Sequence, residues 1–213
     1  MQKSIVIGNE NFKELVKSFV SEENEFIFIP LADSYSEEEL RIIESADIVF
    51  VAVHSKDSIK FFVESYPVEK CNKIIYIFTD ITWMQEKPFR HIVVCRQGEL
   101  FNSVKVLLGM VEKDDLMNLN IEDILSFCTR ETEIYCCEAE IDLIEEEIKN
   151  ILKVQKCQEY DFMIYVNGDV SLFNVKNIVD LLDIKVGTDG IIGVGYRNNN
   201  IIKVCLLYTE RKQ

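Results

Sequence analysis

The sequence predicts an α/β protein with a shortened Rossmann-like, parallel-sheet domain, a connecting helix, and a smaller domain with its own sheet and helices. Two observations indicate this class. Short runs of apolar and β-branched residues alternate with helical periodicity through residues 1–97, which is typical of a doubly wound, mostly parallel sheet. In the second half the predicted strands and helices follow a different order. We therefore expect a first domain at 1–97, a connecting helix at 98–116 and a second domain at 117–213.

Short apolar runs mark the strands of the first half. They are Lys3–Gly8, Glu25–Pro30, Asp47–Val53, Lys73–Phe78 and His91–Cys95. Between them, apolar residues at helical spacing predict helices near 12–20, just beyond Ser36 and at 58–65. Either Ser34 or Ser36 is expected to cap the second helix, because a serine hydroxyl can accept a hydrogen bond from the first turn.

The second half is expected to form a four-stranded sheet that carries helices. The predicted strands are 132–137, Phe162–Val166, 191–196 and 201–208. The predicted helices are 98–112, one that follows from the stretch 117–124 to about Cys128, 141–152 and a helix after Ser171. Ser171 stands where its hydroxyl would accept from the backbone N–H of Asn174 and cap that last helix. The turn residues Gly195–Asn200 predict a hairpin between the final two strands.

Charge and hydropathy limit the partners. Acidic residues outnumber basic ones by 37 to 23, which gives a formal net charge of −14. Nucleic acid and anionic membranes bind basic surfaces, so we expect neither as a partner. No apolar run approaches the roughly 20 residues of a membrane span, and the N-terminal apolar stretch is too short for a signal peptide. A cytoplasmic location is therefore expected.

Neither the cysteines nor the histidines form a metal-binding pattern. The seven cysteines include no CxxC pair, and only His54 and His91 accompany them, so no zinc spacing exists and no metal is expected. The cysteines lie in apolar contexts, which indicates buried, reduced thiols. His54 follows a predicted strand and lies beside Ser55 and Asp57, but adjacency in sequence does not make a catalytic triad. We favour a loop histidine and expect no catalytic residues.

The loops that would hold a nucleotide lack the required glycines. Ligands of such sheets bind beyond the carboxyl ends of the strands, where glycine lets backbone N–H groups approach a phosphate. After the first strand the sequence is Gly8-Asn9-Glu10-Asn11, with a single glycine. After the third strand it is His54–Ser58, with none. The sequence therefore predicts no nucleotide cofactor.

Five motifs of the second half occur in the order of a known family. They are Asn118–Ile124, Ile134–Ala139, Asn167–Val175, Ile191–Gly195 and Ile202–Thr209. This ordered set resembles the C-terminal domain of FtsZ, the bacterial tubulin homologue of the cell-division cytoskeleton. In the first half, Lys3–Gly8 and Ser45–Val51 resemble strands of the same family. The resemblance implies an FtsZ-like fold and a degenerate member, a pseudo-GTPase, because His54–Ser58 replaces the family's glycine-rich signature.

The resemblance also implies a protein-contact loop. In FtsZ filaments the synergy loop of one subunit meets the nucleotide face of the next. Its counterpart here carries the interaction candidates Asn118, Asn120, Glu122 and Asp123. Asn120 replaces the first of the family's two aspartates, and Asp123 stands at the second. An equally good interpretation is purely structural, with Asn118 or Asn120 as a helix N-cap and Glu122 and Asp123 as acids of the first turn.

The sequence thus predicts a non-enzymatic FtsZ/tubulin-like protein that acts through protein–protein contacts. It would cap or modulate a filament of FtsZ-like subunits, or pair with itself as an assembly subunit. The alternative is a GTP-binding, FtsZ-like GTPase with divergent phosphate loops. Since the sequence ends at Gln213, just after the last predicted strand, we expect no counterpart of the family's C-terminal tail, which recruits membrane-tethering partners.

Overall fold

In the part of the chain that the computed structural model describes, nine strands form one sheet. The described residues are 2–19, 24–66, 72–80, 82, 89–112, 119–128, 131–140, 143, 146, 160–168, 171, 173–178, 180, 191–195 and 201–210. The strands are β1 (Gln2–Gly8), β2 (Asn24–Pro30), β3 (Ile48–Val53), β4 (Ile74–Phe78), β5 (His91–Val94), β6 (Glu131–Glu140), β7 (Tyr160–Asn167), β8 (Ile191–Gly195) and β9 (Ile201–Glu210). The helices are α1 (Asn11–Lys17), α2 (Glu37–Ser45), α3 (Lys56–Ser65), α4 (Leu100–Met110) and α5 (Ile121–Phe127).

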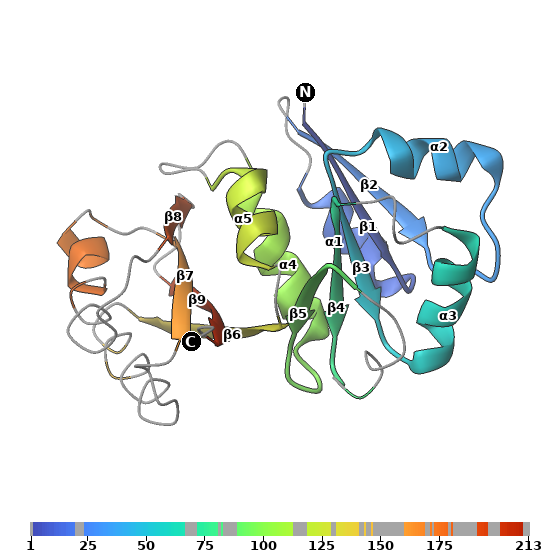
Figure 1. Cartoon of the computed structure of the whole chain (residues 1–213). Coiled ribbons are helices and arrows are strands. Elements are labelled where there is room, and N and C mark those ends of the chain that lie inside the picture. Colours follow the sequence, from blue (N-terminus) through green and yellow to red (C-terminus); the bar gives the residue numbers. More distant parts are fainter. Residues whose placement is uncertain are drawn as a thin grey trace.

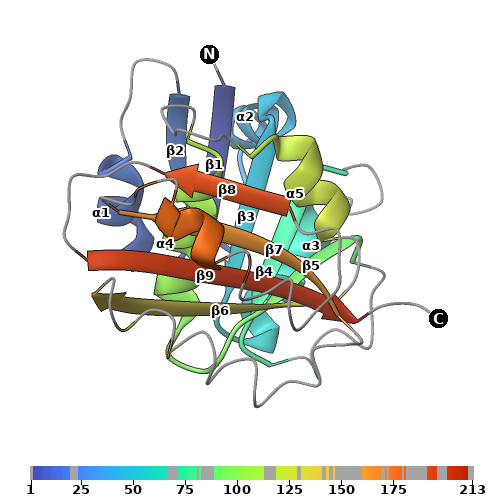
Figure 2. The same cartoon turned by 90° about the vertical axis from the view of Figure 1, so that its left-hand side faces the viewer.

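The first six strands of the sheet are parallel, which confirms the α/β prediction. Their order is β2-β1-β3-β4-β5-β6, and every neighbouring pair is parallel. The order then continues through β9 and β7 to β8, where β9 is antiparallel to both its neighbours and β8 is parallel to β7. In Figure 2 the strands β6–β9 run across the direction of β1–β3.

Two predictions for the second half are wrong. The expected four-stranded sheet does not exist as a separate sheet, because β6 pairs with β5 from Ile92↔Glu131 onward and joins all nine strands. The expected hairpin between the last two strands is also absent, because β7 lies between β8 and β9. Turn residues after Gly195 give no information about which strand β8 pairs with. The turn at 196–200 and most of the predicted helix at 141–152 lie outside the described residues.

Helices cover both faces of the parallel strands. One core cluster joins alternate strand residues such as Val6 and Phe50 to α1, α4 and α5. The other joins the intervening residues, such as Ile5 and Val49, to α2 and α3. This division follows from the period of two in a strand, and it explains why these strands are apolar throughout. Figure 1 shows α2 and α3 on the side of the sheet away from α4.

Local capping agrees with the sequence prediction at two helices. The Ser36 hydroxyl accepts from the backbone N–H of Glu39, and the Glu39 carboxylate accepts in return from the N–H of Ser36, which makes a capping box at α2. Ser171 accepts from the N–H of Asn174 at 3.2 Å, ahead of helical residues 173–178. Both serines therefore begin helices by satisfying N–H groups that the first turn leaves unpaired.

Candidate functional site

The carboxyl end of β1 is closed by an aromatic ring. Gly8 ends the strand, and a Cβ atom placed on it would lie 2.7 Å from the ring of Phe12 in α1. Phe12 is 1% exposed, so its ring is buried at this strand end. The single glycine of this loop gives room to a phenylalanine side chain of the same chain.

Two further rings extend this aromatic group across the ends of the strands. The Phe101 ring, at the start of α4, stacks on Phe12 with 5.7 Å between centroids. The His54 ring, just after β3, packs against Phe12 at 5.8 Å. Partial burial lowers the pKa of His54 below its ordinary value. Its packing fits the predicted loop histidine, on the exposed edge of the protein.

A small hollow lies among these residues. It has a volume of about 300 Å³ and combines the aromatic rings with the side-chain amides of Asn9, Asn11 and Gln97. The Oδ1 atom of Asn9 is buried and has no hydrogen-bond partner among the described residues. No Asp, Glu, Lys or Arg contributes to the described part of the lining. The hollow therefore offers aromatic faces and amides, with no cation for a phosphate.

The opposite end of the parallel strands carries the predicted contact loop. Asn120 is the N-cap of α5, where its Oδ1 accepts from the backbone N–H of Glu122 at 2.9 Å. Glu122 and Asp123 lie in the first turn, as the structural interpretation requires. That interpretation is confirmed for Asn120, while Asn118 lies outside the described residues. The cap uses the Asn120 oxygen, so this atom is engaged with its own helix.

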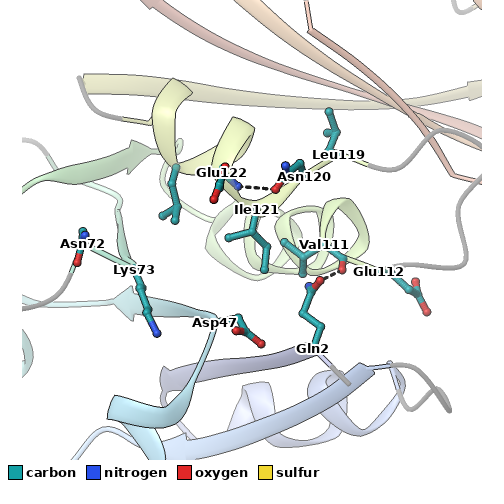
Figure 3. Close-up of a pocket in the computed structure, with 11 residues that line it drawn as sticks. Gln2, Asp47, Asn72, Lys73, Val111, Glu112, Leu119, Asn120, Ile121 and Glu122 are labelled. Atoms are coloured by element: carbon teal, nitrogen blue, oxygen red, sulfur yellow. Dashed lines mark hydrogen bonds between the residues drawn. The ribbon is translucent and has the colours of Figure 1, made fainter.

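A larger hollow of about 790 Å³ lies beside this cap, between α5 and the amino ends of β1, β3 and β4 (Figure 3). Asn120 and Glu122 line it, whereas Asp123 is not among its lining residues. Several of its polar groups are already held: the Gln2 amide donates to the Val111 carbonyl at 2.9 Å, and the Lys73 ammonium donates to the Ala46 carbonyl at 2.7 Å. The structure thus brings two of the four interaction candidates to one surface hollow.

His91, which sequence reasoning treated only as a strand residue, is buried near this hollow. It is 3% exposed, and neither ring nitrogen has a hydrogen-bond partner among the described residues. Burial lowers the pKa of His91, and the nearby backbone carbonyls of Asn72 and Leu125, which line the hollow, oppose that shift. The only feature of the sequence that could have indicated this buried histidine is its position as the first residue of an otherwise apolar strand.

The described cysteines agree with the prediction of buried thiols. Cys95, Cys128 and Cys205 are buried and are not in disulfides, and burial raises the pKa of Cys128 to about 12. A thiol with so high a pKa is a poor nucleophile, because the thiolate is the reactive form. Across the described residues, no three His, Cys, Asp or Glu side chains gather into a group able to hold a metal ion.

Comparison with solved structures finds a similar fold in FtsZ, CetZ and TubZ proteins. An empty FtsZ dimer of M. jannaschii matches with a TM-score of 0.71 at 15% identity, over 98% of this chain and 88% of that one. The W319Y mutant of M. jannaschii FtsZ matches with a TM-score of 0.65 at 14% identity, over 98% of this chain and 91% of that one. CetZ from Methanosaeta thermophila matches with a TM-score of 0.60 at 13% identity, over 100% of this chain and 88% of that one. The chain has an FtsZ-like fold.

The likeness is one of fold rather than sequence. No protein-family model matches the chain, and no curated protein matches it. TubZ of Bacillus thuringiensis, solved as protofilaments in the GDP form, has the same fold at a TM-score of 0.60 and only 10% identity. The motif resemblance to FtsZ is therefore confirmed at the level of architecture. Within the described residues, no helix is long and apolar enough to cross a membrane.

Proposed function

We propose that this chain is a non-enzymatic FtsZ/tubulin-like protein that acts through protein–protein contacts, by binding the end of a filament of FtsZ-like subunits. The end of the parallel sheet near α5 serves as the contact face. The opposite end, where the family holds its nucleotide, does not accept a further subunit in the family's manner. One-sided binding of this kind would cap filament growth.

The observation that carries the proposal is the packing of Phe12 over Gly8. Phosphate loops work because a bare glycine backbone lets several N–H groups approach the anion. Here the space above Gly8 is filled by Phe12, whose ring would be 2.7 Å from a Cβ at that position. The described lining of the neighbouring hollow has no lysine or arginine, and the ammonium of Lys13 nearby is paired with the Glu10 carboxylate at 3.7 Å. These features support the loss of triphosphate binding at this end.

The α5 end supports the contact role. Its hollow of about 790 Å³ is the larger of the two, and Asn120 and Glu122 line it. By resemblance to FtsZ, this loop is the part of a subunit that meets the nucleotide face of its neighbour. Asp123 keeps an acid at the position of the family's second aspartate, partly exposed on the first turn of α5.

Light scattering of a polymerising FtsZ from the same cell tests the proposal. Added protein should slow or stop the rise in scattering at substoichiometric amounts, because each filament end needs one cap. Asp123→Asn should weaken this effect, while the control Asp57→Asn, an exposed acid in α3 at the other end of the sheet, should not. Unchanged polymerisation at a stoichiometric excess would sink the capping proposal.

Self-association is a second candidate, favoured by the assemblies of similar structures. The TubZ structure is one of protofilaments, and one FtsZ structure is a dimer. An assembly subunit of this chain would pair with its own copies in place of a separate filament. Sedimentation equilibrium over a wide concentration range separates the two candidates, because a pure capping protein stays monomeric and an assembly subunit gains mass with concentration.

A further inference from the structure

The larger hollow, beside α5, carries an excess of negative charge. Its described lining holds three carboxylates and one ammonium, a net charge of −2, from Asp47, Glu112, Glu122 and Lys73. The Lys73 ammonium already donates to the Ala46 carbonyl at 2.7 Å. Within the described part of the chain, neither Asp47 nor Glu122 forms an ion pair. The hollow is therefore complementary to a cation that comes from outside the chain.

The three carboxylates come from separate elements and are spread around the hollow. Asp47 precedes β3, Glu112 follows α4 and Glu122 lies in the first turn of α5. They do not form a metal site, since no three such side chains gather closely enough among the described residues. Figure 3 shows Asp47 and Glu122 on opposite sides of the hollow, with Ile121 between them. A cation that meets both must have several donors spread over an extended group.

Apolar side chains form the rest of the wall. Val111, Leu119, Ile121 and Leu125 line the same hollow, and both Ile121 and Leu125 are half-buried. An aliphatic stem can cover such side chains while its charged end stays beside carboxylates and water. The volume of about 790 Å³ lies well within the range of ligand pockets, so it admits a long side chain in full. The favoured occupant is cationic at one end and apolar along its stem.

We propose that this hollow receives an arginine side chain of the filament subunit that the chain caps. The arginine stem packs on Ile121 and Leu125, and the guanidinium donates to the carboxylates of Asp47 and Glu122. Arginine suits this wall better than lysine, because its planar fork directs five N–H donors toward separate acceptors. Arginine is also enriched in protein interfaces, where lysine is depleted. The inference rests on the proposed function, since it names the partner's chemistry at the same contact face.

NMR titration of the ¹⁵N-labelled full chain with N-acetyl-argininamide at low salt tests the proposal. Shift changes should gather at Asn72 and at residues 120–125. Asp47→Asn and Glu122→Gln should each weaken argininamide binding by about threefold, the typical effect of one exposed ion pair. N-acetyl-citrullinamide, which has a similar shape but no charge, should bind about tenfold more weakly because it lacks both pairs. The control Asp57→Asn, an exposed acid at the other end of the sheet, should leave binding unchanged.

Both variants should fold. Asp47→Asn keeps a side-chain oxygen for the backbone N–H of Lys3, which donates to Asp47 at 2.7 Å, and Glu122 is exposed. Three results would overturn the inference: no binding of argininamide, shift changes spread over other acidic surfaces, or equal binding of citrullinamide. Equal binding of N-acetyl-lysinamide would also overturn it, because the hollow would then select charge alone.

The inference and the proposed function fail separately. In the light-scattering assay, the double variant Asp47→Asn/Glu122→Gln should cap FtsZ filaments less well than the wild type. If the wild type caps and the double variant caps equally well, capping stands and the arginine contact is wrong. If argininamide binds in the hollow while FtsZ polymerisation is unaffected by the wild type, the capping proposal is wrong and the hollow remains an arginine site.

Discussion

The hydroxyl of Tyr165 on β7 donates a hydrogen bond of 3.1 Å to the backbone carbonyl of Gly109 on α4, and the contact is buried. It joins residues 56 apart in the sequence and ties the antiparallel end of the sheet to the helix that also packs on the parallel strands. In Figure 1, α4 lies between these two parts of the sheet. A Cβ on Gly109 would stand only 3.3 Å from the Tyr165 oxygen, so the absence of a side chain permits this approach.

We expect Tyr165→Phe to lower the free energy of unfolding by roughly 1–2 kcal/mol, because a buried carbonyl loses a partner. Gly109→Ala should raise the free energy of unfolding more, or lower it less, in the Tyr165→Phe background than in the wild type. Alanine improves helix propensity by about 1 kcal/mol, and only the wild type crowds the new methyl group. Urea denaturation of the four proteins measures both effects. Additive free energies would contradict the proposed crowding.

Much of the fold could be predicted because its signals are local. Buried strands such as β3 need apolar side chains on both faces, and that requirement is visible as an unbroken apolar run at Ile48–Val53. Ser36 and Asn120 could be recognised as caps for the same reason, since each acts within three residues of itself. The pairing of β8 with β7 depends on contacts distant in sequence, so the turn chemistry after Gly195 misled the prediction.

Only part of the candidate site could be predicted from the sequence. Counting glycines after β1 predicted that the phosphate loop is missing. The ring that packs over Gly8 could not be predicted, because Phe12 occupies an ordinary core position of α1. Its orientation depends on Phe101, 89 positions later, and on His54 from a third segment. The buried state of His91 likewise follows from the packing of α5 over β5, which no local pattern encodes.

Gly8 should tolerate no side chain while Phe12 is present. Gly8→Ala places a methyl group 2.7 Å from a buried ring, so we expect a loss of about 1–3 kcal/mol in the free energy of unfolding. The second change Phe12→Leu should make Gly8→Ala less harmful than it is in the wild type, because the smaller side chain vacates that space. Urea denaturation measures this. A Gly8→Ala variant as stable as the wild type would show that Phe12 is not fixed against the strand end.

Asn120 should matter to α5 through its side-chain oxygen. Asn120→Ala removes the acceptor for the Glu122 N–H, and we expect it to cost about 1 kcal/mol. Asn120→Asp keeps an oxygen at the cap and restores the charge that the FtsZ loop carries, so its stability should stay near that of the wild type. Thermal unfolding compares the two variants. Equal losses in both would contradict the capping role.

His91 should make stability depend on pH. Burial lowers its pKa in the folded chain below the ordinary value of about 6.5, so between the two pKa values the unfolded chain binds more protons. The free energy of unfolding should therefore fall as pH drops below about 6.5 and level off below the folded pKa. Urea denaturation at several pH values should show that the free energy of unfolding depends less on pH in His91→Gln than in the wild type. His54→Gln is the comparison variant: burial also lowers the pKa of His54, but its side chain is far more exposed than that of His91, so the pH dependence should change less than in His91→Gln.

GTP should not stabilise the protein. A ligand that binds only the folded chain adds about 2.7 kcal/mol at 100 times its Kd, which would raise the melting temperature by several degrees. With Phe12 over Gly8 and no described cation in the adjoining hollow, we expect no shift with millimolar GTP and Mg²⁺. An FtsZ measured alongside serves as the positive control. A rise that depends on the triphosphate, and that guanosine does not reproduce, would favour the GTPase alternative over the non-enzymatic proposal.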